Sequence, residues 1–270
     1  MKVIPCKIDN SSERLEIFLR NNNGYIKYNF AHFIADSANA NTWNIYNAVY
    51  CNDKFQEIQE LTTSGEWECA VKLSGNPDFS GGITHGDELM DSISIFVDGK
   101  EIDVDTLTSL TQFKNLTIIE SSEMYNPSEP SNLMAEHGRE YIFTEKLVIN
   151  QILKWKISGV QLTNSYLAMF PASKSSTSKI YTNKNYEVED IETAYGQYTG
   201  VTSVTTYGDK LNAKFTINKY DTRFPDTFLL TDNGGGSYNK QYFIASNNTS
   251  WLKENEVWKA QVIYELNYND

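Results

Sequence analysis

The segment Ser80–Glu88, which reads Ser-Gly-Gly-Ile-Thr-His-Gly-Asp-Glu, places an imidazole beside two carboxylates in a glycine-rich stretch. Its glycines favour a sharp turn, because glycine adopts positive φ without steric cost. His85 is one of only three histidines in the chain. Next to Asp87 and Glu88 it can act as a general base or acid, while the carboxylates bind substrate or orient the ring. The segment predicts a chemical site, and a solvated turn is the alternative.

A second group of reactive side chains lies at alternate positions that lead into a strand-like run. His137, Arg139 and Tyr141 project from one face at period two. Arginine can hold a carboxylate through two parallel hydrogen bonds, and the other two side chains can remove and supply protons. A polysaccharide lyase needs this combination, with His85 or His137 as base and Tyr141 or Tyr166 as proton donor. The alternative is an ordinary edge strand with the tyrosine packed inward.

Other chemistries have weaker signals. His85, Asp87, Glu88 and His137 together suit a divalent metal, with calcium on the two carboxylates, although their spacing matches no zinc or EF-hand motif. No other cofactor is predicted. A glycoside hydrolase needs two carboxylates that face each other across a cleft, and none of the 35 acidic residues is singled out as such a pair. Serine-nucleophile and phosphate-binding glycine motifs are not found.

Strand patterns dominate the chain. The clearest is residues 258–268, where alternate positions are apolar, and similar alternation marks 66–73, 92–99 and 213–218. Only residues 53–61 and 105–113 show helical spacing. Many strands without intervening helices predict an all-β fold of two stacked antiparallel sheets, a jelly-roll or lectin-like sandwich, with a closed barrel as the alternative. We expect one domain over residues 1–270, with 127–132 as the candidate subdivision.

Composition excludes several partners. The 270-residue chain has a net charge of −12, and such a chain repels the phosphates of nucleic acids. It holds no apolar run of about 18 residues, so we expect no membrane span, and its start does not resemble a signal peptide. The three cysteines lack metal-type spacing and predict buried free thiols in a reducing compartment. The 17 Tyr, 13 Phe and 5 Trp predict an aromatic core, and any exposed rings suit sugar stacking.

Short segments of the chain resemble tail-fibre and baseplate-type proteins of phages and prophages of low-GC Gram-positive bacteria. They are Gly65–Glu68, Asp78–Gly82, His85–Glu88, Phe96–Gly99 and Tyr166–Pro171. The resemblance implies assembly in the host cytoplasm, location in the virion, contact with other virion subunits and contact with a bacterial cell-surface glycan. The expected architecture also resembles jelly-roll polysaccharide lyases, although their Gln-x-His and Tyr-x-Lys motifs are missing.

The sequence therefore predicts a carbohydrate-active, phage tail-associated protein that recognises and cleaves a surface polysaccharide. Its catalytic residues are expected among His85, His137, Arg139, Tyr141 and Tyr166, with Asp87 and Glu88 in substrate binding. Two alternatives remain open. One is a non-catalytic glycan-binding module whose rings stack on sugars, and the other is a structural virion subunit that forms a homo-oligomer through a sheet edge.

Overall fold

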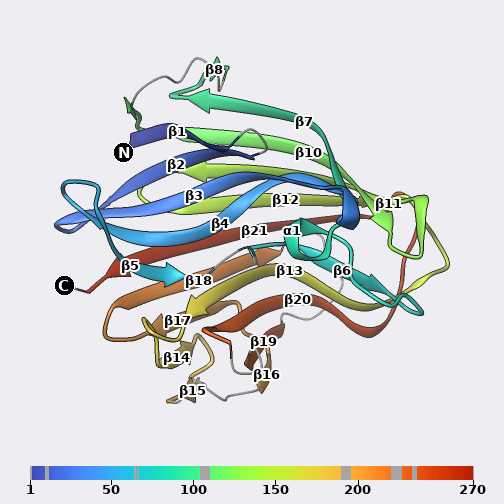
Figure 1. Ribbon diagram of the computed structural model, residues 1–270. Coiled ribbons are helices and arrows are strands. Elements are labelled where there is room, and N and C mark those ends of the chain that lie inside the picture. The colour runs from blue at the N-terminus through green and yellow to red at the C-terminus, as the bar shows by residue number, and fades with distance from the viewer. Residues whose placement is uncertain are drawn as a thin grey trace.

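The protein is nearly all β, as the strand patterns predict (Figure 1). The computed structural model describes residues 2–9, 12–63, 65, 67–103, 110–189, 196–219, 227–232 and 236–269. Side chains are described over the same ranges, except at 2–13, 219, 231–232 and 246–250. Within these residues the helical structure is limited to the 3-10 turn η1 (Asp36–Ala38) and the one-turn helix α1 (Gly82–His85).

The strands range from 2 residues in β9 to 15 residues in β11. In chain order they are β1 Lys2–Asp9, β2 Ser12–Asn21, β3 Gly24–Ala35, β4 Ala40–Asn52, β5 Glu57–Thr62, β6 Ala70–Leu73, β7 Glu88–Val97, β8 Lys100–Ile102, β9 Thr111–Gln112, β10 Leu116–Asn126, β11 Glu129–Phe143, β12 Leu147–Trp155, β13 Gln161–Ser173, β14 Lys179–Thr182, β15 Glu187–Val188, β16 Gly196–Thr199, β17 Ser203–Tyr207, β18 Leu211–Lys219, β19 Thr227–Asp232, β20 Tyr238–Trp251 and β21 Val257–Tyr268.

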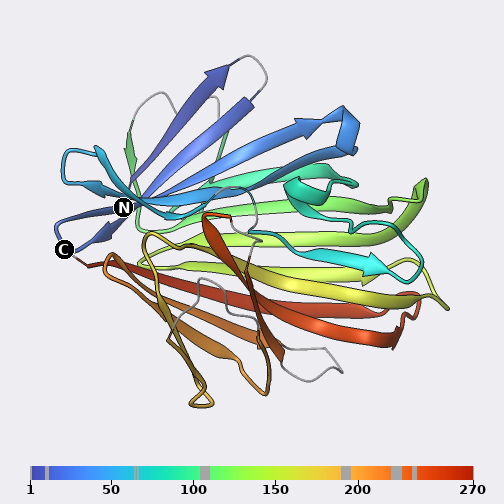
Figure 2. The same ribbon diagram turned by 60° about the horizontal axis from the view of Figure 1, so that its bottom comes forward.

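The strands form two antiparallel runs that join in one mixed sheet. The first run follows the order β9-β1-β2-β3-β4-β5-β13-β20-β19-β16, and β6 also pairs with β13. The second follows β8-β7-β10-β11-β12-β21-β18-β17-β14-β15. A short parallel pairing between β4 and β7 connects the runs. Figures 1 and 2 both show β13 beside β20 on one side of β21. This topology confirms the all-β class but does not identify a jelly roll.

The main core lies where the apolar faces of the two runs meet. Rings from the first run pack against rings from the second, as in the pairs Tyr28–Phe143, Phe30–Tyr141, Trp67–Tyr264 and Phe170–Phe215. The predicted alternation of residues 258–268 is confirmed, because every second side chain from Trp258 to Tyr268 is buried. The aromatic content therefore fills the core, where edge-to-face and offset contacts stabilise the packing.

One local helix prediction is wrong. Residues 53–61 do not form a helix: Phe55 has a φ of 64°, which no α-helix accepts, and Glu57–Thr62 forms β5 against β4. The helix predicted for 105–113 falls largely on residues 104–109, outside the described residues, and Thr111 and Gln112 form β9. Residues 127–128, within the candidate subdivision at 127–132, make the tight turn of the β10–β11 hairpin.

Two of the three cysteines can be placed. Cys51 and Cys69 are free and buried, as predicted, while the side chain of Cys6 lies outside the described side chains. Across the part of the chain that the structure describes, no helix has the length and apolar character needed to cross a membrane.

Candidate functional site

The residues predicted to form one active centre lie in two separate environments. His137, Arg139 and Tyr141 point from β11 into the core and are at most 4% exposed. His85, at the end of α1, and Tyr166, on β13, are partly exposed. The side chain of His137 is fully buried, so it does not line a surface groove with His85.

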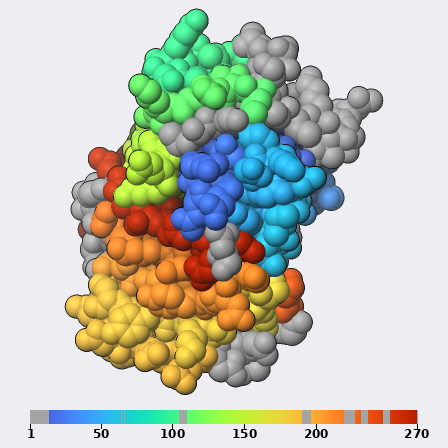
Figure 3. Space-filling view, turned by 90° about the vertical axis from the view of Figure 1, so that its left-hand side faces the viewer, coloured from blue at the N-terminus to red at the C-terminus, as the bar shows by residue number. Residues whose placement is uncertain are grey.

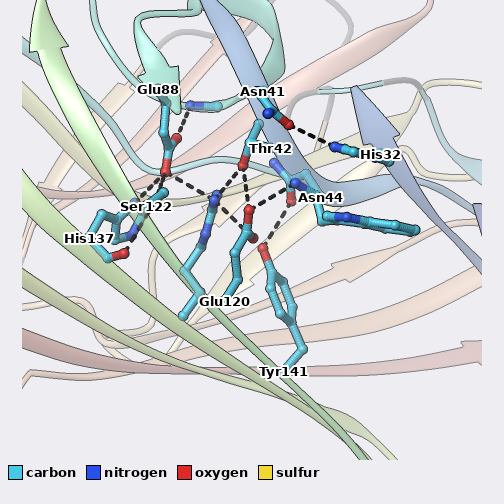
Figure 4. Close-up of polar contacts among 12 residues, drawn as sticks. His32, Asn41, Thr42, Asn44, Glu88, Glu120, Ser122, His137 and Tyr141 are labelled. Atoms are coloured by element: carbon cyan, nitrogen blue, oxygen red, sulfur yellow. Dashed lines mark hydrogen bonds and ion pairs between the residues drawn. The ribbon is translucent and has the colours of Figure 1, made fainter. Parts of the chain in front are cut away.

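The buried group is built around the carboxylate of Glu88, the first residue of β7 (Figure 4). Its Oε1 accepts hydrogen bonds from Ser122 Oγ at 2.6 Å and from His137 Nδ1 at 2.9 Å, and lies 3.0 Å from Nη2 of Arg139. Its Oε2 accepts a hydrogen bond from the backbone N–H of Gly82 at 2.6 Å. Every oxygen of this fully buried carboxylate is therefore matched by donors.

Arg139 links Glu88 to a second buried carboxylate. Its Nη2 lies 3.0 Å from Glu120 Oε2 on β10 and donates to Thr42 Oγ1 on β4. Thr42 Oγ1 and the backbone N–H of Trp43 both donate to Glu120 Oε1 at 2.9 Å. Because these strands belong to both runs, the network ties the runs together beside the β4–β7 pairing.

The two carboxylates differ in their electrostatics. Burial opposes ionisation of Glu88, but the charges of Arg139 and His137 and the hydrogen bonds from His137 and Ser122 outweigh it and hold the pKa well below its usual range. Burial raises the pKa of Glu120; Arg139 opposes this rise and the charge of Glu88 adds to it. Burial also works against the charge of Arg139, yet Glu120 and Glu88 raise its pKa. The same guanidinium therefore contacts one carboxylate whose pKa is lowered and one whose pKa is raised.

This burial excludes the predicted lyase chemistry for the trio on β11. Tyr141 is 1% exposed, packs on Phe30, and has its hydroxyl 3.5 Å from Asn44 Oδ1. Burial raises the pKa of this hydroxyl above its usual value. His137 is held between Glu88 and Gln151 Oε1, whose amide also donates to the backbone carbonyl of Leu167. Side chains that are buried in this way stabilise the fold and do not contact a polysaccharide.

His85 has a different setting, at the surface and between two carboxylates. Its Nε2 lies 3.7 Å from Glu68 Oε1 and its Nδ1 lies 3.4 Å from Asp78 Oδ1. The side chain of Glu68 is 4% exposed and that of Asp78 is 66% exposed, while the imidazole itself is 25% exposed. Glu68 Oε2 also accepts the backbone N–H of Thr84 at 3.3 Å. An accessible imidazole with a buried carboxylate on one side is suited to proton transfer.

His85 begins a row of rings on the face of β13 and β20 that points away from the main core. The ring of Phe79 lies 4.8 Å from His85 and 5.1 Å from Tyr166, and Tyr166 lies 4.3 Å from Tyr242 with an interplanar angle of 24°. Lys72 Nζ lies 5.5 Å from the centre of the Phe79 ring. We call His85, Phe79, Tyr166 and Tyr242 the aromatic row. Met169, Ile244 and Leu229 pack with its tyrosines in a cluster separate from the main core.

Short hydrogen-bonded turns place the row. Val71 and Ser80 exchange backbone hydrogen bonds of 2.9 and 2.8 Å, which folds the segment with Phe79 back along β6. The next residues form α1, and the N–H of Gly81 donates to the carbonyl of Gly86 at 2.8 Å. Gly82 has a φ of 72°, and a Cβ there would lie 1.9 Å from Glu68 Oε2. Glycine is therefore required where the loop passes Glu68.

Asp87 bonds to segments next to β4 and β10 and does not belong to the aromatic row. Its Oδ1 accepts from Asn39 Nδ2 at 3.3 Å, its N–H donates to the carbonyl of Ala38 at 2.9 Å, and its carbonyl accepts from Tyr125 at 2.8 Å. These bonds join the start of β4 to the end of β10. Of the four residues predicted as an alternative metal site, Glu88 and His137 are in contact at 2.9 Å, and within the described residues no group of three or more His, Cys, Asp or Glu is placed to hold a metal ion.

Sequence reasoning missed Glu68, Phe79 and Tyr242. Glu68 carried a signal, because it lies on the polar side of the alternating run 66–73, opposite Trp67 and Cys69. Phe79 sits two residues before the glycine pair, in a segment that had been singled out for another reason. Tyr242 had no sequence signal, since its place in the row depends on the pairing of β20 with β13.

The structure also contains a hollow of about 700 Å³ beyond the end of β11. It is lined by residues 113–114, 144–146 and 265–267, which include Lys114, Lys146, Glu145 and Glu265. In Figure 3, which looks onto this end of the molecule, the yellow-green β11–β12 hairpin lies beside the red last strand. The hollow contains none of the predicted site residues.

Comparison with known proteins shows a likeness of fold. No protein-family model matches the sequence, and no curated protein is similar to it in sequence. The crystal structure of galactose 1-epimerase from Lactobacillus acidophilus NCFM is similar over 100% of this chain and 99% of that one, with a TM-score of 0.51 and 7% identity. A putative aldose 1-epimerase from Escherichia coli K12 covers 94% of this chain and 99% of its own, with a TM-score of 0.44 and 10% identity.

The likeness to galactose 1-epimerase corrects the functional prediction from the sequence. The prediction of a phage tail-associated, lyase-like protein is wrong, because the fold over the full chain is similar to that of a galactose 1-epimerase. The structure does not test the predicted virion location, partner subunits, homo-oligomer or calcium.

Proposed function

We propose that the protein binds a small aldose on the aromatic row. The observation that carries the proposal is the row itself: the rings of Phe79, Tyr166 and Tyr242 form a continuous stack, and His85 with two carboxylates lies at its end. The C–H face of a pyranose packs on such rings, and carboxylate and imidazole groups accept hydrogen bonds from its hydroxyls. The two facing runs of strands, in this proposal, act as a sandwich that holds the site.

A second candidate function is the exchange of sugar anomers at the same place. Opening a cyclic aldose requires a base that removes the anomeric hydroxyl proton and an acid that protonates the ring oxygen, and closure reverses both transfers. His85 Nε2 and Glu68 Oε1 lie 3.7 Å apart, and in this proposal these two side chains carry out the proton transfers. The fold of the similar Lactobacillus acidophilus protein, a galactose 1-epimerase, supports this choice of reaction.

The binding experiment titrates the protein with galactose, glucose and galacturonate, by calorimetry and by sugar-observed NMR. We expect Phe79→Ala and Tyr166→Ala to weaken binding about tenfold, which corresponds to about 1.4 kcal/mol. Tyr181→Ala and Tyr207→Ala are the matched controls, because these tyrosines are 41% and 42% exposed and lie outside the row. Binding that is equal in all four variants, or absent from the wild type, would overturn the proposal.

The reaction experiment follows the optical rotation of freshly dissolved α-galactose with and without the protein. Acceleration that His85→Gln and Glu68→Gln both abolish, while sugar still binds, would support anomer exchange. An unchanged rate in the wild type, together with measurable sugar binding, would leave a binding protein and reject the enzyme.

A further inference from the structure

The loop that presents His85 is fixed from two sides by buried carboxylates. On one side, Glu88 Oε2 accepts the N–H of Gly82 at 2.6 Å; on the other, Glu68 Oε2 accepts the N–H of Thr84 at 3.3 Å. His85 is the next residue after Thr84 and ends the single turn of α1. The position of its ring therefore depends on where these two backbone N–H groups are held.

Glu88 is itself immobilised. Its other oxygen contacts Ser122, His137 and Arg139, on two further strands of the second run. Apart from the 180° flip that exchanges its two equivalent oxygens, no rotation of the carboxylate keeps all of these partners, because both oxygens are engaged. Charge-assisted hydrogen bonds of this kind are short and directional. The contact with Gly82 is thus as rigid as the network behind it.

We propose that Glu88 is a positioning residue, which sets the place of His85 through the backbone of Gly82 and is itself oriented by Arg139, His137 and Ser122. The inference rests on the proposed function only in the statement that His85 faces the sugar. His137 and Arg139, two of the three buried residues that resembled a catalytic set, thereby acquire a role, because they orient the carboxylate that fixes the loop.

Glu88→Gln tests the contact directly. All partners of this carboxylate are donors, so an amide must turn its NH2 toward one of them. The Oε1 side has three donors, including a guanidinium, so the amide oxygen stays there and the NH2 meets the N–H of Gly82. Two donors repel, and the loop must move.

Glu120→Gln is the matched control. Glu120 is as deeply buried, shares the same nitrogen of Arg139, and contacts Thr42 and Trp43 but not the loop. Both variants are expected to lower the melting temperature. Only Glu88→Gln is expected to shift the NMR signals of the His85 imidazole and the Gly82 amide, and to weaken sugar binding about tenfold.

A milder pair covers the case in which Glu88→Gln does not fold. Ser122→Ala removes one donor from Glu88, whereas Thr42→Val removes one from Glu120. We expect the His85 signals to shift in Ser122→Ala and to stay in place in Thr42→Val. Signals that do not move in the Glu88-side variants, or that move equally in both pairs, would overturn the positioning role. If the wild type binds no sugar while these signals shift as expected, the proposed function alone fails.

Discussion

Glu88 Oε1 and Glu120 Oε2 each lie 3.0 Å from the same atom, Nη2 of Arg139. The carboxylates come from β7 and β10 of the second run, and Glu120 is also bonded to Thr42 on β4 of the first run. One guanidinium therefore offsets two buried negative groups at the place where the two runs join. Its loss would leave Glu88 with His137 alone and Glu120 without the cation that it contacts, in a low-dielectric interior.

The first prediction concerns that cation. Arg139→Met should lower the free energy of unfolding by about 3–5 kcal/mol, because it leaves buried carboxylates unpaired. Arg14→Met is the control, since Arg14 pairs with Glu16 at 3.2 Å with its side chain 23% exposed, and partly exposed pairs contribute at most about 1 kcal/mol. Urea unfolding measures both. In a background of Glu88→Gln and Glu120→Gln, the Arg139→Met loss should shrink; an undiminished loss would show that packing, rather than charge, sets the cost.

The second prediction is a pH dependence with a defined sign. The pKa of Glu88 is held below its ordinary value of 4.5 in the folded protein, so its ionised form stabilises the fold at every pH above that value. The free energy of unfolding of the wild type should exceed that of Glu88→Gln by a constant amount from neutral pH down to about 4.5. This difference should shrink as the pH falls further. Unfolding midpoints measured between pH 3 and 7, at about constant ionic strength, test this dependence.

Glu120→Gln should show the opposite slope. The pKa of Glu120 is raised in the folded protein, so its contribution to stability is fully present below the ordinary value and is lost as the pH rises through the raised one. The difference in the free energy of unfolding between wild type and Glu120→Gln should therefore become smaller as the pH rises. If the stability difference from wild type changes with pH in the same direction in both variants, the opposite pKa shifts of Glu88 and Glu120 would be contradicted.

The strands could be predicted from the sequence where one face is buried. Trp258–Tyr268 alternates because β21 lies in the middle of the second run, with one side on the core and the other outside. The failure at residues 53–61 has an equally local cause: Phe55 and Ile58 have helical spacing, but the segment pairs with β4 and its turn forces Phe55 to positive φ. Tertiary pairing overrode the local pattern.

The candidate site was less accessible to sequence reasoning. His137, Arg139 and Tyr141 do share one face, as the period of two requires, but that face points inward. The two-residue period of a strand shows which side chains share a face, but it does not show which face is buried. His85 and Tyr166 were both selected, yet the ring that joins them, Phe79, reaches them through a hairpin turn. Contacts made by chain pairing are not encoded in any single segment.

The third prediction concerns the buried thiols. Burial raises the pKa of Cys51 to about 11 and raises that of Cys69 still further. Since the thiolate is the reactive form, both should react with a disulfide reagent far more slowly than a free cysteine at neutral pH. In a Cys6→Ser background, the native protein should release almost none of the coloured thiolate of the reagent until urea unfolds it. A fast reaction of one thiol per protein molecule would instead show that one of the two cysteines is exposed.

The last prediction separates backbone strain from steric contact in the loop that carries His85. Gly82 and Gly99 both have positive φ, at 72° and 81°, but a Cβ at Gly99 meets nothing within 4 Å, whereas one at Gly82 meets Glu68 Oε2 at 1.9 Å and Glu68 Cβ at 2.5 Å. Gly99→Ala should therefore cost only the left-handed conformation, about 1–2 kcal/mol. Gly82→Ala must also displace a buried glutamate, so it should cost more and should shift the His85 signals. Equal unfolding free energies for the two variants, with unmoved His85 signals in both, would mean that Glu68 yields freely and does not fix the loop.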